Sequence, residues 1–179
     1  AQIDQTIGPL VLFDDEASPD RVDVRHLQWP RPSPDGERLA FSALAHVWVM
    51  DLPDGEPRRL TTGNEATEHS PQWSPDGQWI TWVSWQDSEG GHVWRARSDG
   101  RGEPEQVSRI PGYYDKVAWS PDGSRILAVR APARERAAFI DELNRGQIVS
   151  RDLVWFPAEG GDATVITPLS GETTRYIAS

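Results

Sequence analysis

One tetrapeptide, Ser-Pro-Asp-Gly, occurs three times in the chain and constrains its fold more than any other feature. The copies are Ser33-Pro34-Asp35-Gly36, Ser74-Pro75-Asp76-Gly77 and Ser120-Pro121-Asp122-Gly123, and they start 41 and 46 residues apart. Proline presets the first corner of a tight turn, aspartate bonds to the backbone that follows, and glycine accepts a positive φ. Each copy therefore predicts a structural turn between two strands, with the aspartates as turn residues rather than catalytic acids.

The residues around each turn repeat as well. A short strand before the turn carries Trp29, Trp73 or Trp119, and apolar segments follow the turn at Leu39–Ser42, Ile80–Val83 and Ile126–Val129. Third strands are expected at His46–Val49, His92–Arg95 and Asp152–Trp155, and fourth strands at Arg59–Thr61, Glu105–Val107 and Thr164–Ile166. Four short antiparallel strands in about 40–50 residues are typical of one β-propeller blade.

We therefore predict an all-β fold, a β-propeller made of four-stranded antiparallel blades. A single partial propeller region spans residues 1–179, with blade-like repeats at about 22–62, 63–108 and 109–168. The flanks at 1–20 and 171–179 are expected to be strands of adjacent blades. Natural propellers usually have 4–8 blades, and three blades leave open sheet edges. The chain is therefore either a piece of a longer propeller protein or a propeller that closes by pairing with a second copy. The sequence pattern favours the first alternative.

The third repeat carries an insertion between its second and third strands. A proline precedes the insertion and a glycine follows it, as at the start and end of a helix. Phe139, Ile140 and Leu143 are spaced three and four residues apart, so they would form one apolar stripe on a helix. We predict a short helix at about 133–145 that caps the blade or packs on a neighbouring domain, with a partner-docking or lid element as the alternative.

The repeated residues resemble a known family. Trp-Ser-Pro-Asp-Gly, an Ile-x-aromatic strand, His-Val-Trp, Asp-Gly and an apolar-Thr ending are similar to the TolB-type, WD-like propeller repeat of bacteria, from Val22 to Ile166. The first copy departs from this pattern, with Pro32 where the others have Trp, although Trp29 lies three residues upstream.

A narrower resemblance points to one kind of parent protein. Trp48–Pro53, Pro111–Tyr114 and Asp152–Trp155 resemble propeller regions that precede an amidohydrolase domain in long bacterial proteins. This resemblance implies a metal-dependent hydrolase whose zinc belongs to a domain outside this sequence. The chain itself is then expected to hold no cofactor.

Composition and motifs exclude several functions. The chain has 28 acidic and 18 basic residues and a net charge of -10, which disfavours nucleic acid because acidic surfaces repel phosphates. It has no cysteine, which excludes disulfides and thiolate chemistry, and no apolar run long enough to span a membrane. Gly-x-Ser-x-Gly, His-Glu-x-x-His, His-x-His and phosphate-binding glycine loops are all absent.

The candidate ligand or partner face is formed by the loops opposite the Ser-Pro-Asp-Gly turns, where function tends to lie. It comprises Glu65, Glu68, His69, Trp85, Tyr113, Tyr114, Asp115, Phe139, Ile140 and Leu143. For Trp85, Tyr113 and Tyr114, packing between blades is the favoured alternative. Glu65, Glu68 and His69 are of residue types that suit zinc. A solvated acidic loop explains them equally well, so we predict no metal site and no catalytic residue. His46 and His92 recur at one repeat position and are expected to be structural.

Three functional hypotheses follow. The first is a non-catalytic interaction or scaffold module, part of a larger bacterial hydrolase of amidohydrolase type. The second is a stand-alone, TolB-like, protein-binding propeller in the periplasm. The third is a hydrolase with a site at the blade axis, built from Glu65, Glu68, His69 and Asp115. The expected partner is a protein or the remainder of the same polypeptide, in a periplasmic or secreted setting, with the cytoplasm left open.

Overall fold

The computed structural model describes residues 27–63, 65–131 and 151–169. All secondary-structure elements in this part of the chain are β-strands. Blade 1 contains β1 (Gln28–Pro32), β2 (Arg38–Ala43), β3 (His46–Asp51) and β4 (Arg58–Arg59). Blade 2 contains β5 (Thr67–Trp73), β6 (Trp79–Gln86), β7 (Gly90–Arg97) and β8 (Glu105–Gln106). Blade 3 contains β9 (Tyr113–Trp119), β10 (Arg125–Ala131), β11 (Arg151–Pro157) and β12 (Thr164–Leu169).

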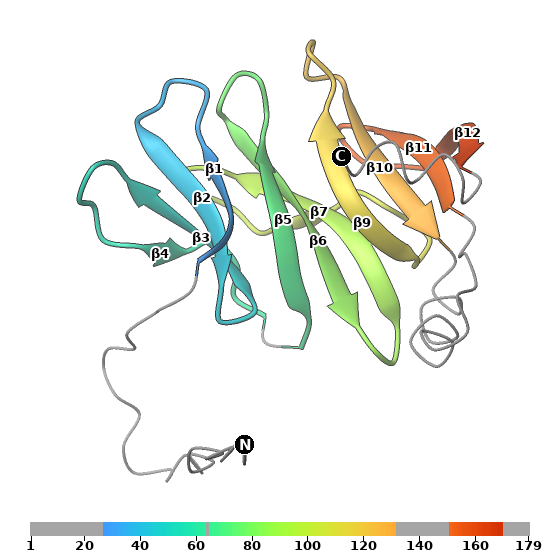
Figure 1. The fold of residues 1–179 in the computed structure, drawn as a ribbon, viewed down its shortest axis with the longest axis horizontal. Helices are drawn as coiled ribbons and strands as arrows, with labels where there is room; N and C mark the ends of the chain where they lie inside the picture. The colour runs from blue at the N-terminus through green and yellow to red at the C-terminus, as the bar shows by residue number, and fades with distance from the viewer. Residues whose placement is uncertain (1–26, 64, 132–150, 170–179) are drawn as a thin grey trace, which may run out of the picture.

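Each blade is a separate four-stranded antiparallel sheet whose strands pair in chain order. The first strands lie next to one another, since β1 contacts β5 and β5 contacts β9. The fourth strands lie at the opposite edges of their sheets, so the sheets fan outward from the first strands (Figure 1). The prediction of an all-β, partial propeller of four-stranded blades is confirmed. The predicted flanking strands at 1–20 and 171–179 and the helix at 133–145, with Phe139, Ile140 and Leu143, lie outside the described residues.

The three Ser-Pro-Asp-Gly turns share one hydrogen-bond pattern. In the second copy, the hydroxyl of Ser74 donates to Oδ1 of Asp76 at 2.5 Å and accepts the backbone N–H of Trp79 at 2.9 Å. The same aspartate oxygen accepts the backbone N–H of Gln78 at 3.0 Å. The turn glycines have φ values of 76°, 68° and 71°, in the region that favours glycine. These contacts explain why the tetrapeptide recurs whole.

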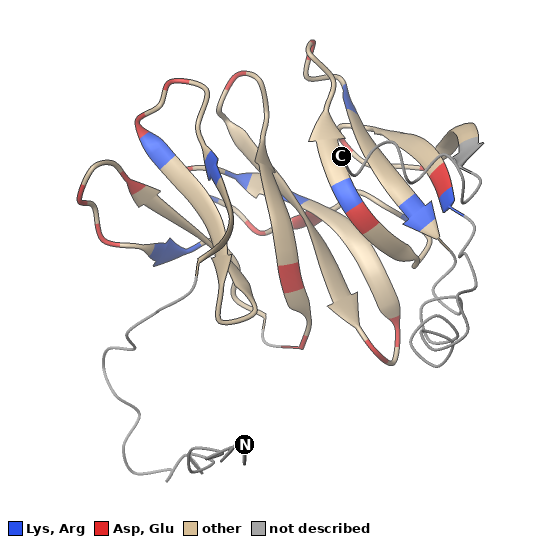
Figure 2. Cartoon of the chain, in the orientation of Figure 1, with Lys and Arg blue, Asp and Glu red and all other residues tan. Residues whose placement is uncertain are grey.

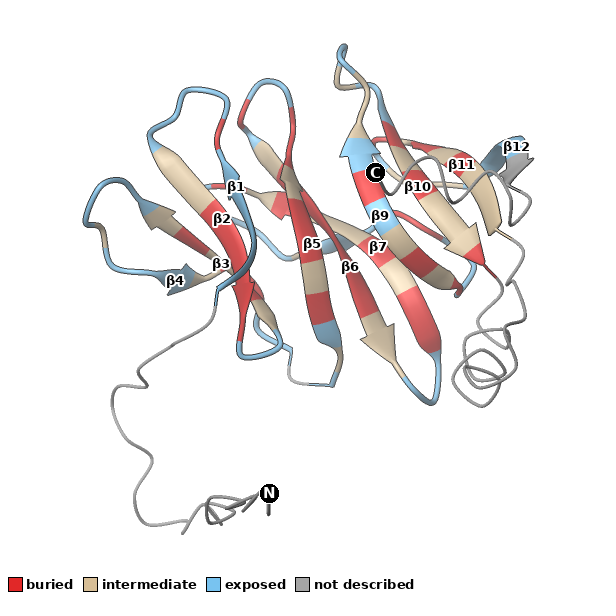
Figure 3. Ribbon diagram, viewed as in Figure 1, coloured by how far each residue is buried: buried red, intermediate tan, exposed pale blue. Residues whose placement is uncertain are grey.

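The hydrophobic core lies between the blades rather than inside any one of them. One cluster joins blades 1 and 2, and it contains Ala40, Val47, Val49, Leu60, Trp73, Ile80, Trp82 and Ala96. A second joins blades 2 and 3, and it contains Val83, Val93, Val107, Tyr114, Val117, Ile126, Ala128, Val154 and Phe156. In blade 2, Trp82 is therefore buried against blade 1 and the adjacent Val83 against blade 3. Figure 3 shows that the buried residues lie along the strands and the exposed ones mainly in the turns and outer strands.

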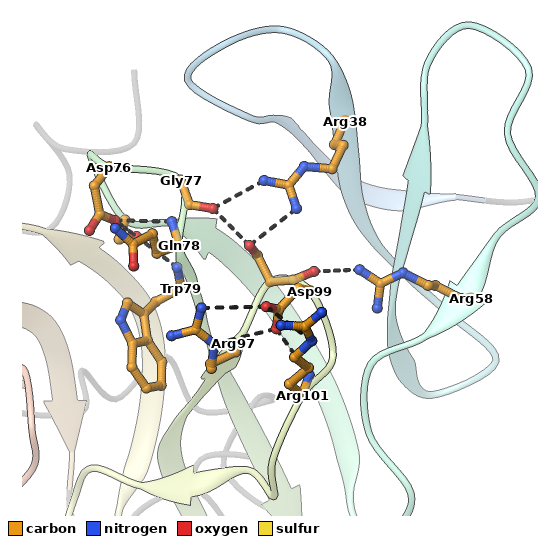
Figure 4. Close-up of polar contacts among 11 residues, drawn as sticks. Arg38, Arg58, Asp76, Gly77, Gln78, Trp79, Arg97, Asp99 and Arg101 are labelled. Atoms are coloured by element: carbon orange, nitrogen blue, oxygen red, sulfur yellow. Dashed lines mark hydrogen bonds and ion pairs between the residues drawn. The ribbon is translucent and has the colours of Figure 1, made fainter.

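Polar contacts add to the junction between blades 1 and 2. The guanidinium of Arg38 donates to Oγ of Ser98 and to the carbonyl of Gly77, each at 3.2 Å, and lies 4.7 Å from the ring centroid of Trp73. Arg58 donates to the backbone carbonyl of Ser98. Figure 4 shows both arginines reaching from blade 1 to the turns of blade 2. Two guanidinium groups thus fix the orientation of one sheet against the next.

The junction between blades 2 and 3 depends on a close backbone approach. Gly91 and Gly112 exchange two hydrogen bonds, of 2.9 and 3.0 Å. A Cβ atom at position 91 would lie 2.5 Å from the carbonyl oxygen of Ser84 and 2.8 Å from that of Gly112. No side chain fits there without backbone movement, so glycine is required for this contact.

One packing expectation needs correction. Trp73 is 8% exposed and donates from its indole Nε1 to the carbonyl of Arg31 at 2.9 Å. Trp29 does not take the place of the missing tryptophan at Pro32, because it is 43% exposed and has a φ of 49°. It faces the open side of the first strands instead.

The turn aspartates predict a specific acid sensitivity. Hydrogen bonds from Ser120 and from the backbone and hydroxyl of Ser124 lower the pKa of Asp122 from 3.8 to about 2. Because the folded pKa is depressed, the stabilisation is present above the unfolded pKa and is lost as the pH falls from about 4 to about 2. Asp122→Asn should therefore flatten the dependence of unfolding free energy on pH in this window, measured by urea unfolding. An unchanged slope would contradict the proposed ionisation.

Candidate functional site

A hollow of about 670 Å³ opens along the first strands of the blades. We call it the inner hollow. One wall comes from the first strands and the end of β6, and it contains Trp29, Arg31, Thr67, His69, Ser70, Gln72, Trp85, Tyr113, Asp115 and Lys116. The other wall is the outer side of blade 3, with Ala118, Leu127, Val129 and Leu153 among its residues. The hollow therefore brings together groups that are far apart in the sequence.

A β-bulge shapes the first strand of each blade. Between Gln28 and Arg31, and again between His69 and Gln72, the first strand has one residue more than its partner. In blade 3 the extra residue lies between Tyr114 and Val117. Bulges redirect side chains and are frequent next to binding sites. Here they fall among the residues that line the inner hollow.

Two aromatic contacts stand in the first-strand wall. The rings of Trp29 and His69 are 5.4 Å apart between centroids, and those of Trp85 and Tyr113 are 5.9 Å apart in an edge-to-face arrangement. The indole Nε1 of Trp85 also donates to Asp87 at 2.6 Å, which fixes the ring. These partly exposed rings offer rigid apolar area with little conformational entropy to lose on binding.

The charged groups of the hollow are mostly basic. Arg31 and Lys116 are exposed, whereas Asp115 is partly buried and forms a 2.9 Å ion pair with Arg151 of β11. One acidic and one basic position lie side by side on β9 (Figure 2). The ion pair engages the one carboxylate among the lining residues, so the wall favours partners with acidic or polar groups beside aromatic ones.

The structure separates the residues that the sequence grouped around His69. His69 and Asp115 line the inner hollow, but Glu65 and Glu68 line a different pocket between blades 1 and 2. Glu68 and His69 are neighbours on β5, and adjacent residues of a strand point to opposite faces. The hypothetical axial set of Glu65, Glu68, His69 and Asp115 is therefore divided between these two cavities, although Glu68 and His69 also line a smaller pocket together. Its role as a hydrolase site stays a prediction. Among the described residues, no three His, Asp or Glu side chains are grouped to hold a metal ion.

Glu68 has a structural role instead. Its Oε2 atom accepts the backbone N–H of Val47 at 3.0 Å and the hydroxyl of Thr61 at 2.6 Å, which ties blade 2 to β3 and to the segment that follows β4 in blade 1. Burial raises the pKa of Glu68, and these two hydrogen bonds oppose the rise. The carboxylate thus satisfies a buried backbone donor at the junction.

Tyr113 and Tyr114 are divided in the same way. Tyr113 lines the inner hollow, but Tyr114 is 1% exposed, packs against Phe156 and donates its hydroxyl to the carbonyl of Ile110 at 2.9 Å. Tyr114 therefore does not belong to the accessible face on which the sequence placed it. Its burial follows from strand alternation on β9, where the neighbouring position faces the core between blades 2 and 3.

The two repeated histidines contact the ends of their own blades. Nδ1 of His46 lies 3.0 Å from a guanidinium nitrogen of Arg59, and burial followed by the charge of Arg59 lowers the pKa of His46. Nδ1 of His92 lies 3.1 Å from the hydroxyl of Ser108. These contacts accord with the structural role predicted from their repetition.

The residues of the first-strand wall that the sequence analysis did not place in the site are Trp29, Arg31, Thr67, Ser70, Gln72 and Lys116. Three of them are followed by proline, at Trp29-Pro30, Arg31-Pro32 and Ser70-Pro71. Proline inside a strand marks an edge or a bulge, so this signal was available in the sequence. Chemically, the hollow offers aromatic, basic and amide groups for binding. Its carboxylate is paired with Arg151, and Nδ1 of His69 lies 3.2 Å from the hydroxyl of the adjacent Ser70.

Comparison with known families agrees with this architecture. The model of the family described as PD40, TolB beta propeller domain, matches residues 24–150, which is more than half of the chain. A solved structure from Agrobacterium tumefaciens, assigned as TolB, superposes with a TM-score of 0.67 at 24% identity, over 84% of this chain and 52% of that one. This likeness shows the fold.

The curated relatives include peptidases. The uncharacterised peptidase YuxL of Bacillus subtilis is 30% identical over 108 residues, which are 55% of this chain and 16% of the relative. Tricorn protease homolog 1 of Streptomyces coelicolor is 33% identical over 99 residues, which are 55% of this chain and 9% of the relative. The chain thus spans a small part of these relatives. They do not support the expected link to amidohydrolases, because the matches point to peptidases and TolB proteins.

Helices that could cross a membrane were sought in the described part of the chain, and none is long and apolar enough.

The roles assigned to Glu68 and His69 predict unequal mutational costs. Glu68→Ala leaves the N–H of Val47 and the hydroxyl of Thr61 without an acceptor, so it should lower the free energy of unfolding by about 2–3 kcal/mol. His69→Ala, on the hollow side of the same strand, should cost less. Urea unfolding of both variants tests this difference. Equal costs would show that Glu68 is not the junction carboxylate.

Proposed function

The chain belongs to the TolB β-propeller family, and on this premise we propose that it is a non-catalytic binding module within a larger protein. Its first-strand wall would receive a peptide segment of a protein partner. The observation that carries the proposal is the gathering of Trp29, Trp85 and Tyr113 beside Arg31 and Lys116 in one hollow. The module would hold no cofactor of its own, and a periplasmic or secreted setting stays a prediction.

The composition of this wall supports protein binding. Aromatic and arginine side chains supply a disproportionate share of the affinity at protein interfaces. The residues of the hollow lie on hydrogen-bonded strands and not on long loops, which keeps the wall pre-organised and lowers the entropy lost on binding.

The partly exposed face of blade 3 supports the proposal that the chain is part of a larger protein. Val47 and Val93 occupy equivalent positions on β3 and β7 and are 0% exposed, because the following blade covers them. Leu153 occupies the same position on β11 and is partly exposed, as is its cross-strand neighbour Val129. A further blade packed on this face would bury both residues and would replace the blade 3 side of the inner hollow as they form it here.

The peptidase relatives suggest what the larger protein does. YuxL and the tricorn protease homologue are named as peptidases, and the chain covers 16% and 9% of their lengths. In a protein of this type, the propeller would bind or orient a peptide substrate while catalysis takes place in another domain. A stand-alone TolB-like binding propeller is the second candidate, favoured by the fold match to the Agrobacterium protein. Both candidates place binding, and not catalysis, in this chain.

A peptide-display selection against the 179-residue chain tests the proposal. Selected peptides should bind the wild type, and Trp29→Ala or Lys116→Glu should weaken binding by about tenfold or more, or ~1.4 kcal/mol. Both side chains are substantially exposed, so the fold should persist. Glu103→Gln, an exposed position outside the hollow, serves as the matched control.

Two results would overturn the proposal. One is peptide binding that neither hollow variant weakens, which would place the site elsewhere. The other is hydrolysis of peptide p-nitroanilides by the purified chain that is lost in His69→Ala while the circular dichroism spectrum is unchanged.

A further inference from the structure

A second cavity, of about 460 Å³, lies between blades 1 and 2 and shares no lining residue with the inner hollow. We call it the inter-blade pocket. Strand alternation separates the two cavities. On β5, Thr67 and His69 face the hollow and Glu68 faces the pocket; on β6, Trp85 faces the hollow and Ser84 faces the pocket.

Carboxylates dominate the charge of the inter-blade pocket. Glu65, Glu68 and Glu89 line it, and no lysine or arginine is among its lining residues. The guanidinium of Arg59 contacts His46 and the carbonyl of Gly63, a lining residue, and its charge opposes the rise in the pKa of Glu68. One positive charge beside three negative ones leaves the pocket acidic, so its electrostatic potential favours a cation.

Glu68 gives the pocket a pre-positioned acceptor. The residue is 9% exposed, and Oε2 accepts both of its hydrogen bonds, from Val47 and Thr61. Its other oxygen, Oε1, has no hydrogen-bond partner among the described residues. A buried carboxylate held by one oxygen has little freedom to turn away, so a ligand that donates to Oε1 would meet a fixed partner. Charge-assisted hydrogen bonds of this kind are stronger than neutral ones.

Two tryptophans complete the lining. Trp82 and Trp94 are directly opposite each other on β6 and β7, and Nε1 of Trp94 donates to Oγ of Ser84 at 2.9 Å. Trp82 is 1% exposed, and its indole Nε1 has no hydrogen-bond partner among the described residues. Indole rings attract cations through their quadrupole, and guanidinium is the cation that most often stacks on them.

The same pairing of guanidinium and indole occurs elsewhere in the chain. Arg38 lies 4.7 Å from the ring centroid of Trp73, Arg95 lies 4.2 Å from that of Trp79, and Arg125 lies 4.3 Å from that of Trp155. The first pair joins blades 1 and 2, and the other two lie within blades 2 and 3. The inter-blade pocket has the rings and the carboxylates but lacks an arginine of its own.

We propose that the inter-blade pocket binds the guanidinium of an arginine side chain from a protein partner. The guanidinium would donate to Oε1 of Glu68, lie beside the indoles of Trp82 and Trp94, and be neutralised further by Glu65 and Glu89. This assignment does not depend on the inner hollow, because the two cavities have separate linings.

The probe for this site is N-acetyl-arginine methylamide, and N-acetyl-citrulline methylamide is its neutral control of nearly the same shape. Nuclear magnetic resonance of the ¹⁵N-labelled chain should show the indole N–H signals of Trp82 and Trp94 moving with the arginine probe and not with the citrulline probe. The double variant Glu65→Gln/Glu89→Gln should weaken binding of the arginine probe by about tenfold, or ~1.4 kcal/mol.

The controls separate this proposal from the peptide site. Glu103→Gln, exposed and outside the pocket, should leave the affinity for the arginine probe unchanged, and so should Trp29→Ala in the inner hollow. The proposal is wrong if the citrulline probe binds as tightly as the arginine probe. It is also wrong if saturating arginine probe leaves the two indole signals in place, or if the double variant binds as the wild type does.

Discussion

Burial of apolar side chains between neighbouring sheets is the interaction on which the rest of this structure depends. A four-stranded sheet of this length has no core of its own, and it becomes stable when both faces are covered. The two clusters are therefore shared, one by blades 1 and 2 and one by blades 2 and 3. The guanidinium contacts of Arg38 and Arg58 and the Gly91–Gly112 approach then fix how adjacent sheets are oriented.

The same packing creates both cavities. Because the first strands converge, their outward-facing residues meet in one hollow, and the bulges turn Trp29 and Ser70 into it. Because the sheets diverge away from their first strands, a gap remains between blades 1 and 2. It is lined by residues that point to the other face of the strand, such as Glu68 beside His69. One strand thus contributes to two sites of different chemistry, one aromatic and basic, the other aromatic and acidic.

The strands were predictable from the sequence because the turn tetrapeptide and the apolar alternation are local signals. Separation of Glu68 from His69, and of Tyr114 from Tyr113, follows from the two-residue period of a strand and was also within reach. The inner hollow could not be predicted from the sequence. Proline after Trp29 and Ser70 indicates a bulge, but the meeting of Arg31, Gln72 and Lys116 depends on how three sheets pack. The helix expected at 133–145 lies outside the described residues.

The central claim is that each blade needs a neighbour on both faces, so the partly exposed face of blade 3 requires a cover. Light scattering coupled to size exclusion, with a hydrophobic dye, tests this claim on the wild type and on Leu153→Asp. The account predicts that the wild-type chain self-associates or binds the dye, and that Leu153→Asp reduces both while the strand signal in circular dichroism persists. A monodisperse wild-type monomer that binds no dye would contradict it.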